Sequence, residues 1–492
     1  MADNTSLGKK LNIFTCEKKL WLDLNCRGVS NPKSMDIAED YAANSVKEFA
    51  YVSFAPSIKI TSENQTDAVK ETLSAISNRN ERTIITDAAF SFGDRIFHID
   101  RLLVKNDGAI EICDIKAATH IRDGFIKELA FKCAALCLLG FAVRKVYIRY
   151  INDSFVKNGP IDANKFFLHK DVTQDVLYYT EENIQNIKKV TEITDEPRCL
   201  ICERCLSPYR CEYWNYCTDY FPENNVFDIA GLSMDRKFEL FFDGILSFED
   251  VEKSGKVSKR QMEQVMANLY SLPPKVDKNE LRSFLSELTY PLYFLDFETF
   301  QSAIPRFDGV RPFTQIPFQY SLHYADAKGG GLCHKEFLAD FEHDPRRALA
   351  VQLVNDIPID ACVLAYNMTF EKGVIRTLAL MFNDLYDDLM RIHNNMRDLM
   401  VPFRKHSYYD RRMNGSHSLK AVLPALFPDD KELDYKNLDS VHNGLEAMIM
   451  YQQGCDADSG TRRNIRENLL NYCGLDTYAM VKILEKLENA SV

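Results

Sequence analysis

Residues 293–299 read YFLDFET, an apolar run that carries two acidic side chains, Asp296 and Glu298. The aromatic and aliphatic neighbours predict a strand that is buried on both faces. Residues i and i+2 of a strand share a face, so both carboxylates are expected to point the same way. Two carboxylates held this close need a proton, a cation or open solvent, and a divalent metal meets that need. The alternative is that one of the two carboxylates lies at the end of the strand and caps the next turn.

Two later segments supply further acids. Residues 361–364 form an apolar run, and the following AYNMTFE places Glu371 on the first turn of a helix predicted over residues 372–382. Residues 472–476, YCGLD, lie in a helical pattern, in which Tyr472 and Asp476 share a face because they are four residues apart. The sequence therefore predicts that four acids and one tyrosine converge.

The order D-x-E, N-x-x-F-E and Y-x-x-x-D over residues 290–492 resembles the DEDD 3′→5′ exonucleases of RNase H-like fold, in the subgroup that carries tyrosine. The resemblance implies that Tyr472 orients the attacking water. It also implies a cage that holds two Mg²⁺ or Mn²⁺ ions for phosphodiester hydrolysis, made of Asp296, Glu298, Glu371 and Asp476. Most of these exonucleases have Asp where this chain has Glu371, so this ligand depends on a tolerant metal geometry.

Five of the fourteen cysteines fall within nineteen residues, from Cys199 to Cys217. Met1–Lys10 is polar, so no secretory signal peptide is expected there, and no apolar run reaches the length of a membrane span. The expected location is the reducing cytoplasm, where clustered thiols indicate a metal rather than disulfides. Zinc and an iron–sulfur cluster both accept four thiolates, so both stay open.

Cys16 lies far upstream of this run. One thiolate far upstream with three downstream resembles the RecB-like nucleases of the AddB and CRISPR-associated kind, in which a [4Fe–4S] cluster joins the two ends of a nuclease domain. The resemblance implies Cys16, Cys205, Cys211 and Cys217 as ligands. A rival set uses Cys202 with Cys205 and Cys211.

Residues 97–103 and 110–116 predict two strands joined by a turn at Asp107-Gly108. Asp114 and Lys116 alternate onto one face, and the hairpin brings Asp100 beside them. This is the PD-(D/E)XK constellation, in which acids hold a metal and the lysine stabilises the hydroxide or the developing charge. Lys132, in a helix predicted over 125–140, stands where such nucleases often carry Gln, so a slow or dead first site is an alternative.

The segment 397–420 is locally basic, and its aromatic residues Phe403, Tyr408 and Tyr409 suit stacking with the bases of a single strand. A solvated loop whose aromatics are tucked into the core is the alternative. The net charge of −11 does not exclude nucleic acid, because binding depends on the local potential. The residues expected to contact the substrate are Arg404, Lys405, Arg411 and Lys420.

A chain of 492 residues implies two or three domains. We expect an α/β protein with a restriction-endonuclease-like domain and cysteine-ligated cluster at 1–222, a connector at 223–289 and an RNase H-like domain at 290–492. End to end, the chain resembles a bacterial family that fuses a RecB-like nuclease to a DEDD exonuclease. The implied activity is 3′→5′ exonuclease action on DNA with a single-stranded 3′ end. The alternatives are an RNA 3′ exonuclease and an inactive protein that binds nucleic acid or a partner.

Overall fold

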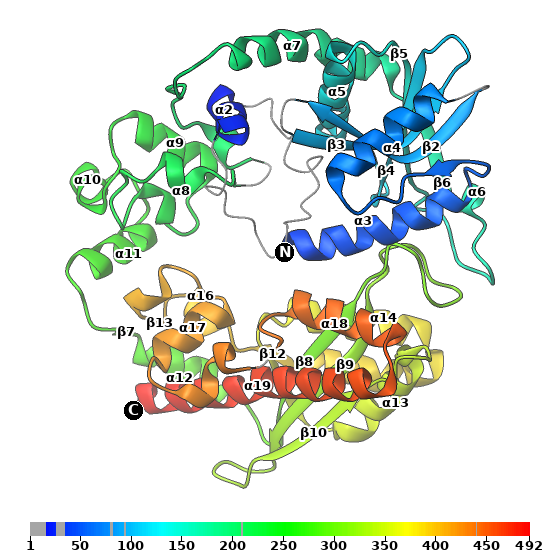
Figure 1. Ribbon diagram of the computed structural model, residues 1–492. Helices are drawn as coiled ribbons and strands as arrows, with labels where there is room; N and C mark the ends of the chain where they lie inside the picture. The colour runs from blue at the N-terminus through cyan, green and yellow to red at the C-terminus, as the bar shows by residue number, and fades with distance from the viewer. Residues whose placement is uncertain (1–15, 26–34, 79–81, 93–94, 208–209, 439) are drawn as a thin grey trace. The chain divides into compact units, whose positions relative to one another are not determined.

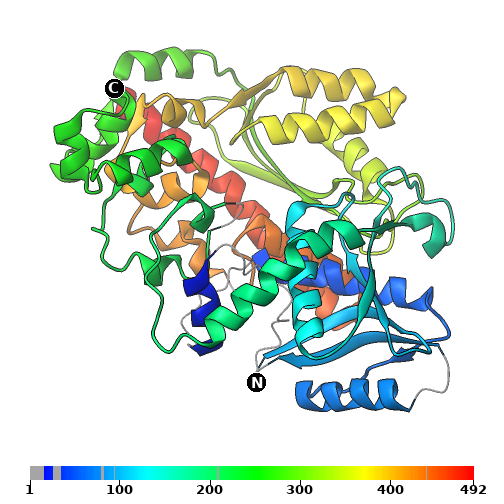
Figure 2. The ribbon, with the colours of Figure 1, turned by 90° about the horizontal axis from the view of Figure 1, so that it is seen from above.

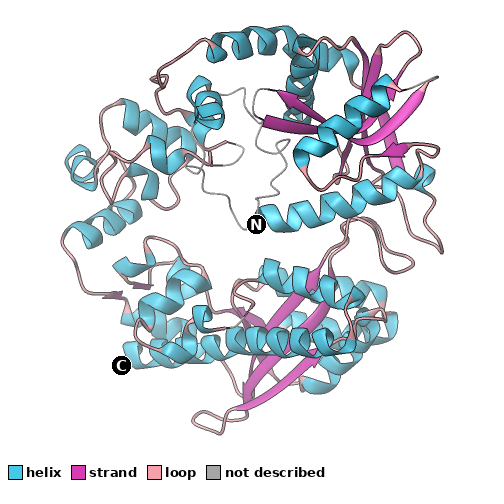
Figure 3. Cartoon of the chain, viewed as in Figure 1, coloured by secondary structure: helices cyan, strands magenta, loops and turns pink. Residues whose placement is uncertain are grey.

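The computed structural model describes residues 16–25, 35–78, 82–92, 95–207, 210–438 and 440–492 (Figure 1). The chain divides into two compact units, Met1–Asp219 with Ser302–Thr314, and Tyr220–Gln301 with Gln315–Val492. Both mix helices and strands (Figure 3), so the α/β prediction is confirmed. Residues 223–289, expected as a connector, belong to the second unit. No helix among the described residues is long and apolar enough to cross a membrane.

A six-stranded sheet forms the centre of the first unit, in the order β1-β2-β3-β4-β5-β6. β3 and β4 are antiparallel, as the predicted hairpin requires, and Gly108 in their connecting turn has a φ of 85°. β4 pairs with β5 in parallel. The strands are β1 (Ile58–Lys59), β2 (Thr83–Phe92), β3 (Arg95–Val104), β4 (Ile110–Lys116), β5 (Val143–Ile151) and β6 (Phe167–Asp171).

Helices pack apolar side chains against this sheet. Phe90 of β2, Phe97 of β3 and Leu129 of α5 belong to one buried cluster that forms the core of the unit. The helix predicted over 125–140 begins and ends two residues earlier than expected. The helices are α2 (Glu17–Asn25), α3 (Met35–Val52), α4 (Gln65–Ser77), α5 (Asp123–Leu138), α6 (Ala163–Phe166), α7 (Thr173–Thr191), η1 (Glu203–Cys205) and α8 (Trp214–Cys217).

The second unit begins with short helices that have a small core of their own. Leu240, Phe248 and Val265 belong to its buried cluster. Ser233, Ser247 and Ser258 cap three of these helices through their side chains, which satisfies backbone N–H groups that the first turn leaves free. The elements are η2 (Val226–Asp228), α9 (Met234–Phe242), α10 (Phe248–Ser254), α11 (Lys259–Leu269) and α12 (Lys278–Ser286).

A five-stranded sheet follows, in the order β10-β9-β8-β11-β12, with β8 at its centre. β9 is antiparallel to β8 and β10, whereas β11 is parallel to β8 and β12. A separate two-stranded pair joins β7 (Lys275–Val276) to β13 (Tyr408–Tyr409). The strands of the main sheet are β8 (Leu292–Phe300), β9 (Ile316–Ala325), β10 (Cys333–Leu338), β11 (Cys362–Ala365) and β12 (Met396–Asp398).

The two faces of β8 meet different helices, because its side chains alternate. Tyr293, Leu295 and Phe297 pack into a core cluster with α13, α14 and α15, while α18 and α19 lie against the other face (Figure 2). Most of β8 is buried, so the predicted strand is confirmed. The helices are α13 (Pro345–Asp356), α14 (Thr369–Met381), η3 (Asn383–Leu385), α15 (Tyr386–Asn394), α16 (Val401–Arg404), η4 (Arg411–Met413), α17 (Leu419–Leu426), η5 (Lys431–Leu433), η6 (Tyr435–Asn437), α18 (Gly444–Asp456) and α19 (Ser459–Ser491).

Candidate metal centre

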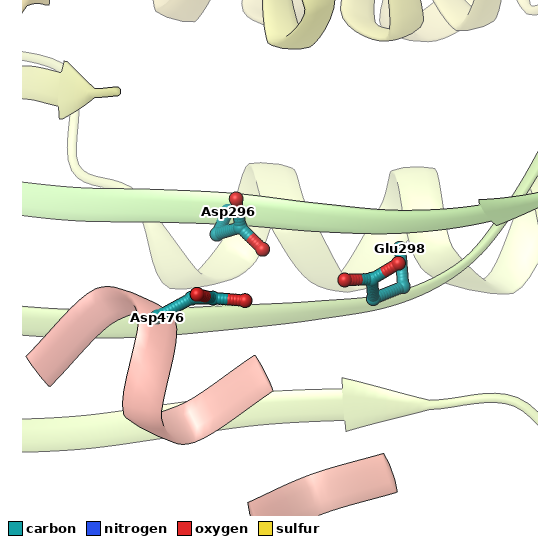
Figure 4. Close-up of side chains that lie close together, drawn as sticks. All are labelled: Asp296, Glu298 and Asp476. Atoms are coloured by element: carbon teal, nitrogen blue, oxygen red, sulfur yellow. The ribbon is translucent and has the colours of Figure 1, made fainter. Parts of the chain in front are cut away.

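Three carboxylates meet between β8 and α19 (Figure 4). Asp296 and Glu298 project from the strand and Asp476 from the helix, and each offers an oxygen within 4.8 Å of the other two. Glu298 and Asp476 are buried, and Asp296 is partly buried. Among the described residues, no Lys, Arg or His side chain lies within the 4.0 Å of an ion pair from any of the three. The triad therefore has the oxygen donors of a hard-cation site, and no described basic side chain forms an ion pair with it.

A hydrogen-bond network fixes α19 over the sheet. The hydroxyl of Thr477, the neighbour of Asp476, lies 2.6 Å from the Ser321 hydroxyl and 2.8 Å from Nδ1 of His323, both on β9. Ser321 also lies 2.9 Å from Nε2 of His334 on β10. Ser321 is the direct cross-strand partner of Asp296, so this network ties the helix to the strand position that carries the first acid.

Burial raises the pKa of every acid in the triad, and repulsion between the acids adds to it at Asp296 and Glu298. Burial is the main cause for Asp296, and the charges of Asp476 and Glu298 add to it, so its pKa lies well above the ordinary value. Burial and then Asp476 likewise raise the pKa of Glu298, against the opposing charge of Lys420. Burial raises the pKa of Asp476 to about 6, although hydrogen bonds from two tyrosines lower it. Protons or cations must therefore compensate this site.

Two tyrosines lie beside the Asp476 carboxylate. Tyr472, predicted from its spacing, lies one helical turn away and lowers the pKa of Asp476. Tyr435 of η6 donates its hydroxyl to Oδ1 of Asp476, and the two rings lie 6.0 Å apart. Sequence reasoning missed Tyr435, because the irregular segment around it carries no periodicity or motif. The Tyr435 hydroxyl therefore holds one oxygen of the Asp476 carboxylate in place.

Two further neighbours of the triad were also missed. The Cys473 sulfur lies 3.7 Å from Oδ2 of Asp296, and this thiol is fully buried. Gly444 opens α18 beside Glu298, where an added Cβ would lie 3.4 Å from Oε2. The side chain of Glu298 therefore lies close to the backbone at the start of α18.

Glu371 lies on the first turn of α14, as predicted, but outside the group of three. It is 3% exposed and its Oε2 has no hydrogen-bond partner. Its charge contributes to the raised pKa values of Asp296 and Glu298, and burial raises its own pKa to about 8. The structure thus brings three of the four predicted acids together and leaves the fourth nearby with an unpaired oxygen.

The four predicted substrate contacts have different surroundings. Lys420, at the start of α17, acts electrostatically on Glu298 and Asp476. Arg404 places Nη1 3.5 Å from Oδ2 of Asp398, whose other oxygen accepts two backbone N–H groups. Lys405 and Arg411 are exposed side chains in the same segment. Of the four, only Lys420 has a direct electrostatic effect on the triad among the described interactions.

Of the two alternatives for the aromatic residues of this segment, the structure shows the second, in which they are tucked into the core. Phe403, Tyr408 and Tyr409 are 2%, 5% and 4% exposed, so their rings belong to the core. Phe403 contacts Tyr408 edge to face, and His406 stacks on Tyr409. The physical reason is that burying large rings stabilises this irregular segment more than exposing them would.

The predicted acids of the first unit are paired with lysines. Lys47 places Nζ 2.7 Å from Oδ1 of Asp100, and the other oxygen of Asp100 accepts the N–H of Ile115. Lys132 and Lys116 place their Nζ atoms 2.8 Å and 3.2 Å from Oδ2 of Asp114. All of these acids and lysines lie on or against β3 and β4.

This pairing does not suit a divalent ion. Burial favours the neutral form of Asp114, yet the charges of Lys132 and Lys116 outweigh it and lower the pKa of this carboxyl. Lys116, predicted as the catalytic lysine, also donates to Glu128 at 2.7 Å. Among the described residues, Asp100 and Asp114 do not join a group of metal-ligand geometry. As arranged, these side chains form an ion-pair network, and the lysine ammonium groups take the place of a cation.

Cys16 and the five cysteines of the 199–217 run belong to the first unit. Cys16 interacts with Cys199, which sequence reasoning left out of the ligand set, and Cys205 interacts with Cys16. The N–H of Cys211 donates to the Cys205 carbonyl at 2.7 Å. Burial raises the pKa of the Cys16 thiol to about 11 and that of Cys205 to about 12. The thiols that affect one another are Cys16, Cys199, Cys202, Cys205, Cys211 and Cys217.

A family model described as a domain of unknown function, DUF2779, matches residues 293–418. This range includes Asp296, Glu298 and Glu371 and ends before Asp476. No curated protein and no solved structure matches the chain.

Proposed function

We propose that the chain is a metal-dependent nuclease that trims DNA from a 3′ end by two-metal phosphodiester hydrolysis. The observation that carries this proposal is the triad of Asp296, Glu298 and Asp476, whose oxygens converge without an ion pair to any described basic side chain. Bound Mg²⁺ or Mn²⁺ would activate a water and stabilise the leaving oxygen. The mixed five-stranded sheet, with helices on both faces, supports an RNase H-like assignment.

The chain's own residues have distinct parts in this reaction. Asp296, Glu298 and Asp476 would hold the ions, and the unpaired oxygen of Glu371 is the available fourth donor. Tyr435 orients Asp476 through its hydroxyl group, and Tyr472 lies one helical turn away, where it lowers the pKa of Asp476. Lys420 adds positive charge beside the acids, where a substrate phosphate would meet its ammonium group.

We assign the first unit a role in gripping nucleic acid rather than cutting it. Its candidate acids Asp100 and Asp114 are paired with Lys47, Lys116 and Lys132, so these two carboxylates are not free to hold a catalytic metal. Its thiols favour a [4Fe–4S] cluster over zinc. Zinc bonds of about 2.3 Å would place the sulfurs about 3.8 Å apart, whereas no three described thiols lie within 4.8 Å of one another.

A digestion assay tests the catalytic assignment. End-labelled single-stranded DNA and RNA are incubated with Mg²⁺ or Mn²⁺ and with wild type, Asp296→Asn or Lys116→Ala. We expect stepwise loss from the 3′ end in wild type and in Lys116→Ala. Asp296→Asn should be slower by at least about a thousandfold, which corresponds to about 4 kcal/mol of lost transition-state stabilisation.

Glu336→Gln serves as the control, because Glu336 is an exposed acid on β10 of the same sheet. It should cut at the wild-type rate. Unchanged trimming by Asp296→Asn would refute the assignment of the triad, and loss of cutting in Lys116→Ala alone would move the chemistry to the first unit. Faster digestion of RNA than of DNA would replace the proposed substrate.

A further inference from the structure

The first unit contains a hollow of about 430 Å³ on one face of its sheet. We refer to it as the arginine pocket. Its walls come from the end of α3, from β2, β3, β5 and α6, and from β6. The lining residues that matter here are Phe54, Arg101, Arg149, Asn164, Phe167 and His169.

Strand register separates this pocket from the ion-pair network of Asp100 and Asp114. Arg101 is paired with Cys113 on β4, and Arg149 is paired with His169 on β6. Neighbouring residues of a strand point to opposite faces, so the two arginines occupy the face that Asp100 and Asp114 do not. The arginine pocket is therefore a second polar site on the same sheet.

Within the part of the chain that the structure describes, no acidic side chain pairs with the arginines of this pocket. Arg149 is only 8% exposed, and its single protein hydrogen bond among the described contacts is a long one, 3.4 Å from Nη2 to the Ala163 carbonyl oxygen. Arg101 has a buried Nε without a partner, and no described carboxylate lies within 4.0 Å of either guanidinium. On the same face, the buried hydroxyl of Thr86, opposite Arg101, is also unpaired. Buried arginines are normally paired, so guanidinium N–H groups without a protein partner, as at Arg101 and Arg149, are unusual.

Aromatic rings hold the guanidinium groups in position. The Cζ atoms of Arg101 and Arg149 lie 5.3 Å and 4.8 Å from the centre of the Phe54 ring, and that of Arg149 lies 4.7 Å from the Phe167 ring. Such stacking engages the face of the guanidinium and leaves its N–H edge free. Burial, with the nearby arginine charges adding to it, lowers the pKa of His169, which marks the pocket as electropositive.

We infer that the arginine pocket binds a phosphate monoester. Two guanidinium groups match the charge of a phosphate dianion, whereas one carboxylate would leave a positive charge uncompensated. Arginine N–H edges bind phosphate in a two-pronged geometry, and the volume of the hollow is within the range of small-molecule sites. A nucleoside monophosphate and the 5′-phosphate of a nucleic-acid strand share this chemistry. The inference is independent of the proposed cutting site.

Titration calorimetry of the full-length protein without added Mg²⁺ or Mn²⁺ tests this inference. The probes are inorganic phosphate, a nucleoside 5′-monophosphate, and one oligonucleotide with either a 5′-phosphate or a 5′-hydroxyl. We expect saturable binding of phosphate at one site. A preference for the 5′-phosphorylated oligonucleotide over the nucleotide would identify a strand end as the ligand, and the reverse preference would identify a free nucleotide.

Three variants locate the binding. Arg101→Gln removes one guanidinium, and Asn164→Glu places a repelling charge at an exposed lining position without disturbing the core. Each should weaken the affinity by at least about tenfold. Arg144→Gln is the control. Arg144 is an exposed arginine of β5, the strand that also carries Arg149, and it is paired with Asp107. Absence of saturable phosphate binding, or wild-type affinity in Arg101→Gln and Asn164→Glu, would each overturn the inference.

Discussion

Glu371 shows how a single buried acid couples protonation to stability. Its folded-state pKa is about 8, against an ordinary value of 4.5, because burial disfavours the charged form. The folded protein therefore holds a proton that the unfolded chain releases between these two values. Stability from this group is fully present below pH 4.5 and is lost as the pH rises to about 8.

Glu371→Gln should remove this pH dependence, because Gln stays neutral. In the metal-free protein at pH 8, we expect the variant to be more stable than wild type by about 3–5 kcal/mol, and close to it at pH 4.5. Urea unfolding at the two pH values measures the difference. Glu336→Gln, at an exposed position, should show no such trend. An equal effect of Glu371→Gln at both pH values would contradict the assignment.

Lys132 is a buried base whose positive charge compensates the buried carboxylate of Asp114. It is 4% exposed and binds Asp114, which is fully buried. Lys132→Met keeps the apolar stem but leaves Asp114 with a poorly compensated charge, which should cost about 3–5 kcal/mol. Lys145→Met removes an exposed surface pair with Asp171, which water and salt screen, so its loss should be much smaller. Thermal and urea unfolding compare the two. Equal losses would mean that Asp114 does not depend on its buried partner.

At the scale of elements, the contact of α19 with β9 determines whether Asp476 faces Asp296. Thr477 is fully buried and bridges Ser321 and His323. Thr477→Val keeps the shape but leaves both partners without this bond, so we expect about 1–3 kcal/mol of lost stability. We also expect weaker Mn²⁺ binding, measured by calorimetry. Thr377→Val, at an exposed site on α14, should change both by little. Unaltered Mn²⁺ affinity in Thr477→Val would show that the network does not position the site.

The same contacts explain what the sequence could and could not predict. Asp296 and Glu298 were predictable because strand alternation is local, and Tyr472 with Asp476 because four residues make a helical turn. Tyr435 reaches Asp476 across 41 residues and Cys473 reaches Asp296 across 177, so tertiary packing alone creates these contacts. The ion pair between Lys132 and Asp114, which are 18 residues apart, likewise depends on how α5 packs against β4.

At the scale of the whole molecule, the cysteines join distant parts of the first unit. Cys16 precedes α2, whereas Cys205 and its neighbours follow α7, so a shared cluster would close a loop of most of the unit. Closing a loop of this length restricts the unfolded chain, and the model for covalent cross-links gives an upper limit of about 5 kcal/mol. The proposed cluster is therefore expected to stabilise the unit as well as to hold its two ends together.

Cys16→Ser tests this expectation, since it removes the upstream thiol of the expected ligand set. We expect wild type purified without oxygen to be brown, with absorbance near ~400 nm from iron–sulfur charge transfer. The variant should lose most of this colour and unfold at a lower urea concentration. Cys333→Ser is the control, because Cys333 is an exposed cysteine of the second unit. A colourless wild type with stoichiometric zinc would replace the cluster by zinc. A Cys16→Ser protein with full colour and unchanged stability would remove Cys16 from the ligand set, and the loop that it closes would no longer contribute to the fold.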